Sequence, residues 1–147
     1  RLPNPTARCG RLTATEPQGD AFPRSALEIR TKQGRQWFNI RLADTPSRQE
    51  RGLMFVRILP SDEGMLFPQV QPRVMAMWMK NTFIPLDMLF IDSRGRVVCL
   101  RERTVPESLD IVSCDQPVKA VLEIGGGQAD KRGIAVGDRV IHKLFSP

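Results

Sequence analysis

The side chains best suited to chemistry lie in the ten residues from Trp78 to Asp87. Lys80 stands at the end of an apolar run, and Asp87 opens the next one. Glu102 comes later, on the far arm of a predicted hairpin, where it would lie roughly beside Asp87. Two carboxylates near one ammonium shift each other's pKa values, which suits acid–base chemistry or the binding of a polar ligand.

Three functions are compatible with this cluster. The favoured one is a non-enzymatic domain that binds a small ligand, a peptide or an envelope partner. Its candidate ligand-binding residues are Trp78, Lys80, Asn81, Thr82, Asp87 and Glu102. The second is a hydrolase or transferase that uses Asp87 and Glu102 as acid and base, which requires both carboxyls to open into a pocket. The third is a structural or interaction module without a ligand, in which the polar network sets the register of the sheet.

The residue types exclude most other machinery. His142 is the only histidine and there is no tyrosine, so a His-rich metal site is excluded. The sequence contains no phosphate-binding loop, dinucleotide fingerprint, GxSxG elbow or HExxH pair. We therefore expect no metal, no cofactor and no assigned catalytic residue. The methionine cluster Met75, Met77 and Met79 and the neighbouring Trp78 are expected to fill the core.

The charge balance is basic but dispersed. There are 22 Lys and Arg against 16 Asp and Glu, a formal net charge of +6. No run of five like charges and no ladder of aromatic residues accompanies them, so we expect no nucleic-acid partner. No apolar run approaches the ~20 residues needed to cross a bilayer, so we expect no membrane span. The oligomeric state does not follow from the sequence.

The three cysteines leave two readings open. Cys99 lies within a predicted strand and Cys114 in the loop before the next one. In an exported protein they could form a disulfide that closes a loop of about 15 residues. Otherwise they are two small buried apolar side chains. Cys9 is the odd one out.

Residues 1–24 and 25–147 differ in character. The first segment has scattered apolar residues among Pro and Gly, which predicts a flexible tail. The chain starts at Arg1 rather than Met, so either a signal peptide was cleaved from it or the sequence was trimmed. Because Pro-rich tails commonly follow an export signal, we expect an exported protein, in the periplasm or the exterior. Residues 25–147 are expected to form a single globular domain.

That domain is predicted to be mainly β. We expect strands at residues 26–30, 36–42, 64–67, 74–80, 86–92, 96–103, 118–124 and 140–144, and short helices at 45–54 and 128–132. Pro68 is expected to end the third of these strands. About seven or more short strands with two short helices predict a compact barrel-like or sandwich domain.

Several strings together resemble one family. They are Arg51-Gly52-Leu53-Met54, Trp78-Met79-Lys80-Asn81-Thr82, Ile84-Pro85-Leu86-Asp87, Val121-Leu122-Glu123 and Val136-Gly137-Asp138. They resemble the core of the family known as domain of unknown function 192, over residues 26–144. The resemblance implies a small bacterial or archaeal domain with a mainly-β, barrel-like fold, often behind an export signal. It implies no activity, cofactor or catalytic residue.

Overall fold

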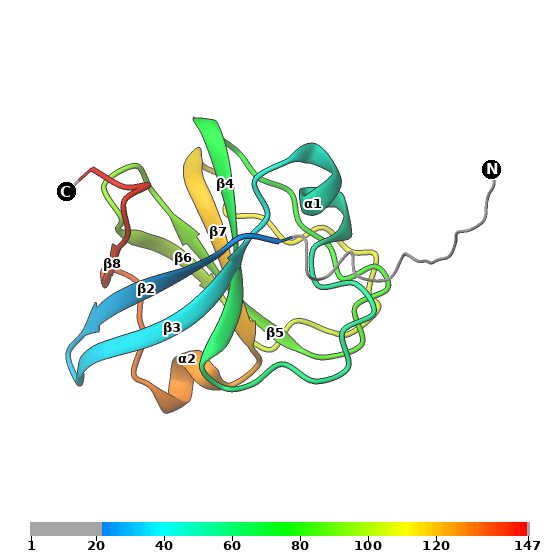
Figure 1. Ribbon diagram of the computed structural model, residues 1–147, viewed down its shortest axis with the longest axis horizontal. Coiled ribbons are helices and arrows are strands. Elements are labelled where there is room, and N and C mark those ends of the chain that lie inside the picture. The colour runs from blue at the N-terminus through cyan, green and yellow to red at the C-terminus, as the bar shows by residue number, and fades with distance from the viewer. Residues whose placement is uncertain (1–21, 147) are drawn as a thin grey trace, which may run out of the picture.

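Seven strands form one mixed sheet in the computed structural model, which describes residues 22–146. The strands are β2 (Arg24–Thr31), β3 (Gly34–Leu42), β4 (Glu63–Arg73), β5 (Leu86–Ile91), β6 (Val97–Arg101), β7 (Val118–Gly125) and β8 (Arg139–Ile141). Their order in the sheet is β6-β5-β7-β4-β3-β2-β8. The sheet curls into a half-barrel, accompanied by α1 (Pro46–Arg51) and α2 (Gln128–Lys131) (Figure 1). The predicted mainly-β class with two short helices is confirmed.

Local sequence signals explain most of these elements. Two hairpins, β2–β3 and β5–β6, form antiparallel pairs around the expected turns. Between β3 and β4, which run parallel, α1 provides the crossover. Thr45 caps that helix by accepting a hydrogen bond from the backbone N–H of Arg48, and Pro46 takes its first turn. Gly52, at a φ of 49°, ends it.

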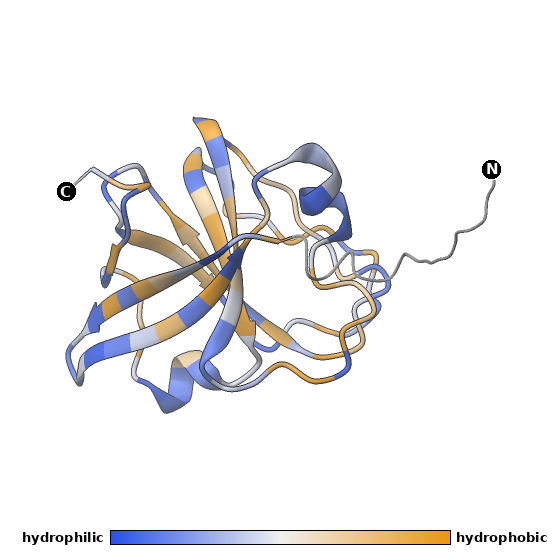
Figure 2. Ribbon diagram, in the orientation of Figure 1, coloured by the Kyte–Doolittle hydropathy of each residue, from blue (hydrophilic) through white to orange (hydrophobic). Residues whose placement is uncertain are grey.

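Side chains of the sheet pack into two separate apolar clusters. The strand cluster is formed mainly by the strands themselves and includes Ile29, Ile40 and Leu122. The loop cluster lies on the other face of β7 and includes Met65 and Val121. Alternation along the central strands produces both, because successive residues of a strand point to opposite faces. Figure 2 shows the resulting alternation of polar and apolar residues along β2 and β3.

Three loops, residues 52–62, 74–85 and 102–117, cover the loop cluster. They gather with α1 on one side of the sheet (Figure 1). Met75 and Met79 of the second loop are buried, as expected for gap-filling methionines. Cys99 of β6 and Cys114 of the third loop, the pair considered from the sequence, are joined in a disulfide.

The strand expected at residues 74–80 is wrong in one respect. Only one isolated bridge, Met77 with Val112, pairs this segment. The chain is nevertheless extended enough to alternate, because Met79 is buried whereas Trp78 and Lys80 are exposed. Trp78, expected in the core, is therefore on the solvent side of this segment and is 45% exposed.

Pro68 does not end β4, contrary to expectation. The strand runs from Glu63 to Arg73, and Pro68 pairs with Ala120 of β7. Pairing with β3 on the other side ends at Leu66, so β4 is an edge strand on that side where the proline stands. A proline is tolerated at an edge, since no ladder hydrogen bond there requires its N–H.

Residues 22–24 belong to the folded domain, although the expected boundary is at residue 25. Phe22 is buried in the loop cluster, the Pro23 carbonyl accepts a hydrogen bond from the Leu42 N–H, and β2 begins at Arg24. Cys9 and most of the expected tail lie outside the described residues.

Candidate functional site

Asp87 is a buried structural carboxylate. It is 0% exposed, and its oxygens accept hydrogen bonds from the backbone N–H groups of Arg103 at 2.8 Å, Gly127 at 3.0 Å and Ala129 at 2.9 Å. These donors belong to the segment after β6 and to the start of α2. Asp87 therefore ties β5 to two other segments, and it does not face either of the cavities described below.

The expected cluster of Lys80, Asp87 and Glu102 does not form. Met88 of β5 pairs with Arg101 of β6, so the next residue of each strand in the antiparallel direction would bring Glu102 opposite Asp87. The Glu102 side chain, however, is exposed and lies 3.6 Å from the Arg103 guanidinium. Among residues 22–146 no ion pair joins Lys80 to either carboxylate. The reason is that β6 ends at Arg101, so Glu102 turns outward instead of continuing the ladder.

Residues 77–82 are held between the first and third loops. On the side of the third loop, the Met79 N–H donates to the Ser108 carbonyl at 3.0 Å. On the other side, the Phe55 N–H donates to the Asn81 carbonyl at 2.8 Å. Phe55 and Asn81 both have positive φ, 67° and 54°. Such conformations are costly for a phenylalanine and persist only where the surroundings hold them.

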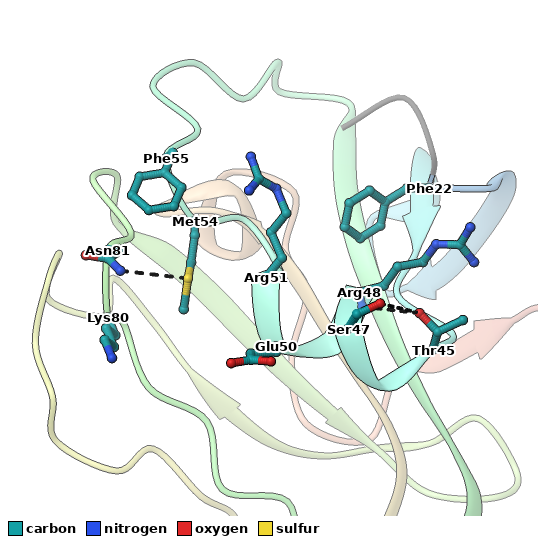
Figure 3. A pocket seen from close by; sticks show the side chains of 10 residues that line it. All are labelled: Phe22, Thr45, Ser47, Arg48, Glu50, Arg51, Met54, Phe55, Lys80 and Asn81. Atoms are coloured by element: carbon teal, nitrogen blue, oxygen red, sulfur yellow. Dashed lines mark hydrogen bonds between the residues drawn. The ribbon is translucent and has the colours of Figure 1, made fainter. Parts of the chain in front are cut away.

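A cavity of about 660 Å³ opens between α1 and this segment (Figure 3). Its lining residues are Phe22, Thr45, Ser47, Arg48, Glu50, Arg51, Met54, Phe55, Lys80 and Asn81. Aromatic and methionine side chains provide an apolar surface, and basic and hydroxyl side chains provide polar contacts. We call it the larger cavity. It is of the size that proteins use for small organic ligands.

A smaller cavity of about 120 Å³ adjoins it. The two share four lining residues, which are Glu50, Arg51, Met54 and Lys80. The smaller cavity is otherwise lined by Gln49, Gly52, Leu53, Phe67, Ala76, Met77, Trp78, Thr82 and Glu123. It thus collects Trp78, Lys80 and Thr82, three of the candidate residues, while Lys80 and Asn81 line the larger cavity.

The shared wall carries two cations, and each lies near an aromatic ring. Arg51 lies with its guanidinium carbon 5.6 Å from the Phe55 ring centroid, and the Lys80 ammonium lies 5.2 Å from the Trp78 ring. Within the described part of the chain neither forms an ion pair. Cation–π contacts hold such groups in place and leave their charge available to a ligand.

Glu123 is the unusual residue of the smaller cavity. It lies in the centre of β7, between Met65 of β4 and Met88 of β5, and is only 4% exposed. Its side chain makes no hydrogen bond or ion pair with any described residue. Burial raises the pKa of its carboxyl from 4.5 to about 8, so at neutral pH it is mostly protonated.

The sequence pointed to Glu123 only as part of a family string, and not as a site residue. The available signal was a glutamate in an otherwise apolar strand, since a lone carboxyl there must be paired or neutral. Arg51 was likewise missed. Both residues become site candidates only because segments far away in the sequence form the cavities around them.

His142 has a structural position at the end of the chain. Its Nδ1 accepts from the Leu144 N–H at 3.2 Å, and its Nε2 lies 2.9 Å from the Ser25 hydroxyl. Burial, and secondly the charge of Lys143, lowers its pKa. Among the described residues no group of three His, Cys, Asp or Glu could hold a metal ion, and no helix is long and apolar enough to cross a membrane.

Comparisons with known proteins place the chain among uncharacterised ones. The family model described as DUF192, uncharacterised ACR, COG1430, matches residues 28–142. A crystal structure from Sinorhizobium meliloti 1021, described as "a putative transcription regulator", is similar with 38% identity and a TM-score of 0.82, covering 84% of this chain and 97% of that one. A protein of unknown function from Novosphingobium aromaticivorans DSM 12444 is similar with 36% identity and a TM-score of 0.82, covering 88% and 91%. No protein with curated function matches.

Proposed function

The chain belongs to the DUF192 family of uncharacterised proteins, and we propose that it is a non-enzymatic domain that binds small amphipathic molecules carrying an anionic group. The ligand would occupy the larger cavity between α1 and the Lys80–Asn81 turn. Its apolar part would contact Phe22, Met54 and Phe55.

The observation that carries the proposal is a pair of cations beside an apolar surface, neither of which forms an ion pair within residues 22–146. Arg51 and Lys80 stand on the wall of a cavity that is large enough for a drug-sized molecule. An anionic group between them would replace water on both cations, and in a partly enclosed site such charge-assisted hydrogen bonds are stronger than neutral ones. Glu50 on the same wall limits how much negative charge the site accepts.

A fluorescent anion with an apolar body, 1-anilinonaphthalene-8-sulfonate, tests this proposal. We expect saturable binding at one site per chain. Met54→Trp, which fills the wall shared by both cavities, should abolish it. Val70→Trp is the matched control, because Val70 is 88% exposed on β4 and lines neither cavity. Circular dichroism verifies that both variants fold.

Charge is tested with a second probe and a second variant. The neutral analogue N-phenyl-1-naphthylamine should bind more weakly than the sulfonate. Arg51→Ala with Lys80→Ala should remove this preference, because it removes both cations from the wall. The proposal is contradicted if the Met54→Trp variant binds the sulfonate as the wild type does, or if the wild type does not bind it. Either result would favour a module without a small ligand.

We also propose that the protein works outside the cytoplasm. The Cys99–Cys114 disulfide supports this location, because disulfides persist in oxidising compartments and are rare in the cytosol. Fractionation of cells that express the full-length gene tests it. The protein should be found in the periplasm or medium with Cys99 and Cys114 resistant to alkylation; a cytosolic, fully alkylated protein would refute it.

The alternatives have less support. An acid–base pair of Asp87 and Glu102 requires both to open into one pocket, whereas the Asp87 oxygens are occupied by backbone N–H groups. The Sinorhizobium protein is described as a putative transcription regulator, and regulators that bind DNA usually place a helix of several turns in the major groove. The helices of residues 22–146 have six and four residues.

A further inference from the structure

Glu123 is the strongest unexplained feature of the molecule. A buried carboxyl normally has partners, because an unpartnered polar group in an apolar environment costs free energy. The neighbouring residues on the same face, Met65 and Met88, offer no strong hydrogen-bonding group. The carboxyl instead faces the smaller cavity, which continues to the wall shared with the larger one.

Building on the proposed function, we propose that the smaller cavity is a subsite for the carboxylate of a monocarboxylic acid, which Glu123 binds by donating its carboxyl proton. The ligand would enter from the larger cavity, place its carboxylate in the smaller one between Glu123 and the two cations of the shared wall, and leave its hydrocarbon part against Met54 and Phe55.

The protonation state of Glu123 selects this ligand chemistry. As a neutral acid it has an O–H to donate, and a hydrogen bond from O–H to an ionised carboxylate is among the short, strong kinds. A ligand ammonium would instead need ionised Glu123, and on its way it would pass the two cations of the shared wall. A phosphate monoester carries up to two negative charges, and Glu50 lines the same cavity as Glu123, so a singly charged carboxylate fits this space better.

Size agrees with a small head group. One water occupies about 30 Å³ of liquid volume, so about 120 Å³ holds a carboxylate with one or two further atoms, whereas a larger body must remain in the larger cavity. The charged groups that line the smaller cavity with Glu123 are Glu50, Arg51 and Lys80. Across the sheet, β4 and β5 contribute only methionines opposite Glu123.

Octanoate is the test ligand, and octylamine and octanol are controls of the same length. Binding is followed by the emission of Trp78 in a Trp37→Phe background, because Trp78 lines the smaller cavity and Trp37 is exposed on β3. Octanoate should bind more tightly than octanol, and octylamine should bind least. The reverse order of octanoate and octylamine would overturn the inference.

The pH dependence identifies the donor. With a Glu123 pKa of about 8, the protonated fraction falls about tenfold between pH 7 and pH 9, so the octanoate affinity should fall about tenfold. Calorimetry in two buffers at pH 8.5 should show proton uptake on binding. Glu123→Gln keeps an N–H donor but does not titrate, so it should bind octanoate at pH 7 and lose the pH dependence. Glu123→Leu should bind at least tenfold more weakly at pH 7.

The outcomes separate the two proposals. If the naphthalene sulfonate binds the larger cavity but octanoate does not bind, or binds with the same pH profile in wild type and Glu123→Gln, the carboxylate subsite is wrong and the proposed function stands. If neither ligand binds, both are wrong.

Discussion

Two buried carboxyls in neighbouring strands have opposite surroundings. Asp87 of β5 pairs with Ile124 of β7, and Glu123 of β7 pairs with Met88 of β5, so they are one residue apart in register and point to opposite faces of the sheet. Asp87 accepts hydrogen bonds from backbone N–H groups after β6 and at the start of α2, whereas Glu123 has no partner among the described residues and borders a cavity.

The difference indicates separate roles. A carboxylate that satisfies several backbone donors holds segments together, and its loss leaves those donors unpaired. A carboxyl without partners stabilises nothing in the folded chain and is better explained by something that binds there. The polar residue that stands out in the sequence, Asp87, is therefore the structural one, and the functional candidate is the inconspicuous Glu123.

Removal of Asp87 should have the largest effect on stability. Asp87→Ala leaves the N–H groups of Arg103, Gly127 and Ala129 without an acceptor, and we expect a loss of about 4 kcal/mol in the free energy of unfolding. Urea unfolding measures it. The control is Asp92→Ala, which removes an exposed acceptor of two turn N–H groups and should cost about 1 kcal/mol. Equal losses would show that Asp87 has no special structural role.

The disulfide should come next. It closes a separation of 15 residues, for which chain entropy gives about 3 kcal/mol. Because it fastens the loop that contacts Met77 and Met79, its loss should affect the Glu123 side of the sheet more than the Asp87 side. In Cys99→Ala with Cys114→Ala, amide exchange should accelerate at Met77 and Val112 and remain slow at Gly127. Uniform acceleration would contradict this division.

Replacement of Glu123 should stabilise the protein. The unfolded chain loses the Glu123 proton near pH 4.5, whereas the folded chain keeps it up to about pH 8. The folded state therefore binds more protons within this range, and stability falls as the pH rises through it. At pH 7 the shifted pKa lowers the free energy of unfolding by about 3 kcal/mol. A buried Gln amide without a partner would cost about 1 kcal/mol, so Glu123→Gln should raise the free energy of unfolding by about 2 kcal/mol.

The pH dependence of the stability of Glu123→Gln tests the same prediction. Thermal unfolding from pH 4 to pH 9 should show a flatter stability profile for Glu123→Gln than for the wild type. Parallel profiles would mean that Glu123 is ionised in the folded protein, in which case it cannot donate a proton to a ligand.

Thr104 should show the smallest effect, and it links the two regions. Its hydroxyl donates to the Leu86 carbonyl at 2.9 Å and lies 3.2 Å from the Met79 sulfur. We expect Thr104→Val to cost about 1 kcal/mol, measured by urea unfolding. Thr31→Val, at the end of β2, is the control and should cost less, because the hydrogen bond from the Thr31 hydroxyl to the Gly34 carbonyl is exposed. An equal loss would mean that the buried hydroxyl adds nothing beyond an ordinary turn contact.

Local signals in the sequence predicted most of the fold. Thr45-Pro46 marks the helix start, and Ser93-Arg94-Gly95 marks a hairpin, because caps and turns depend on a few neighbouring residues. The errors occurred where distant segments decide. Pro68 lies within β4 only because β3 stops pairing at Leu66, and residues 77–79 bond to the third loop instead of forming a ladder.

The amino-acid sequence alone determined the class of the fold, the family resemblance and the importance of the segment around Trp78 and Lys80. Only the tertiary structure decided which acidic residue borders a cavity. Strand alternation specifies that Asp87 and Glu123 are each on some face of the sheet, but the donors of α2 and the loops over β7 come from elsewhere in the chain. Whether a buried carboxyl is satisfied or left free depends on those partners, and they are set by long-range packing.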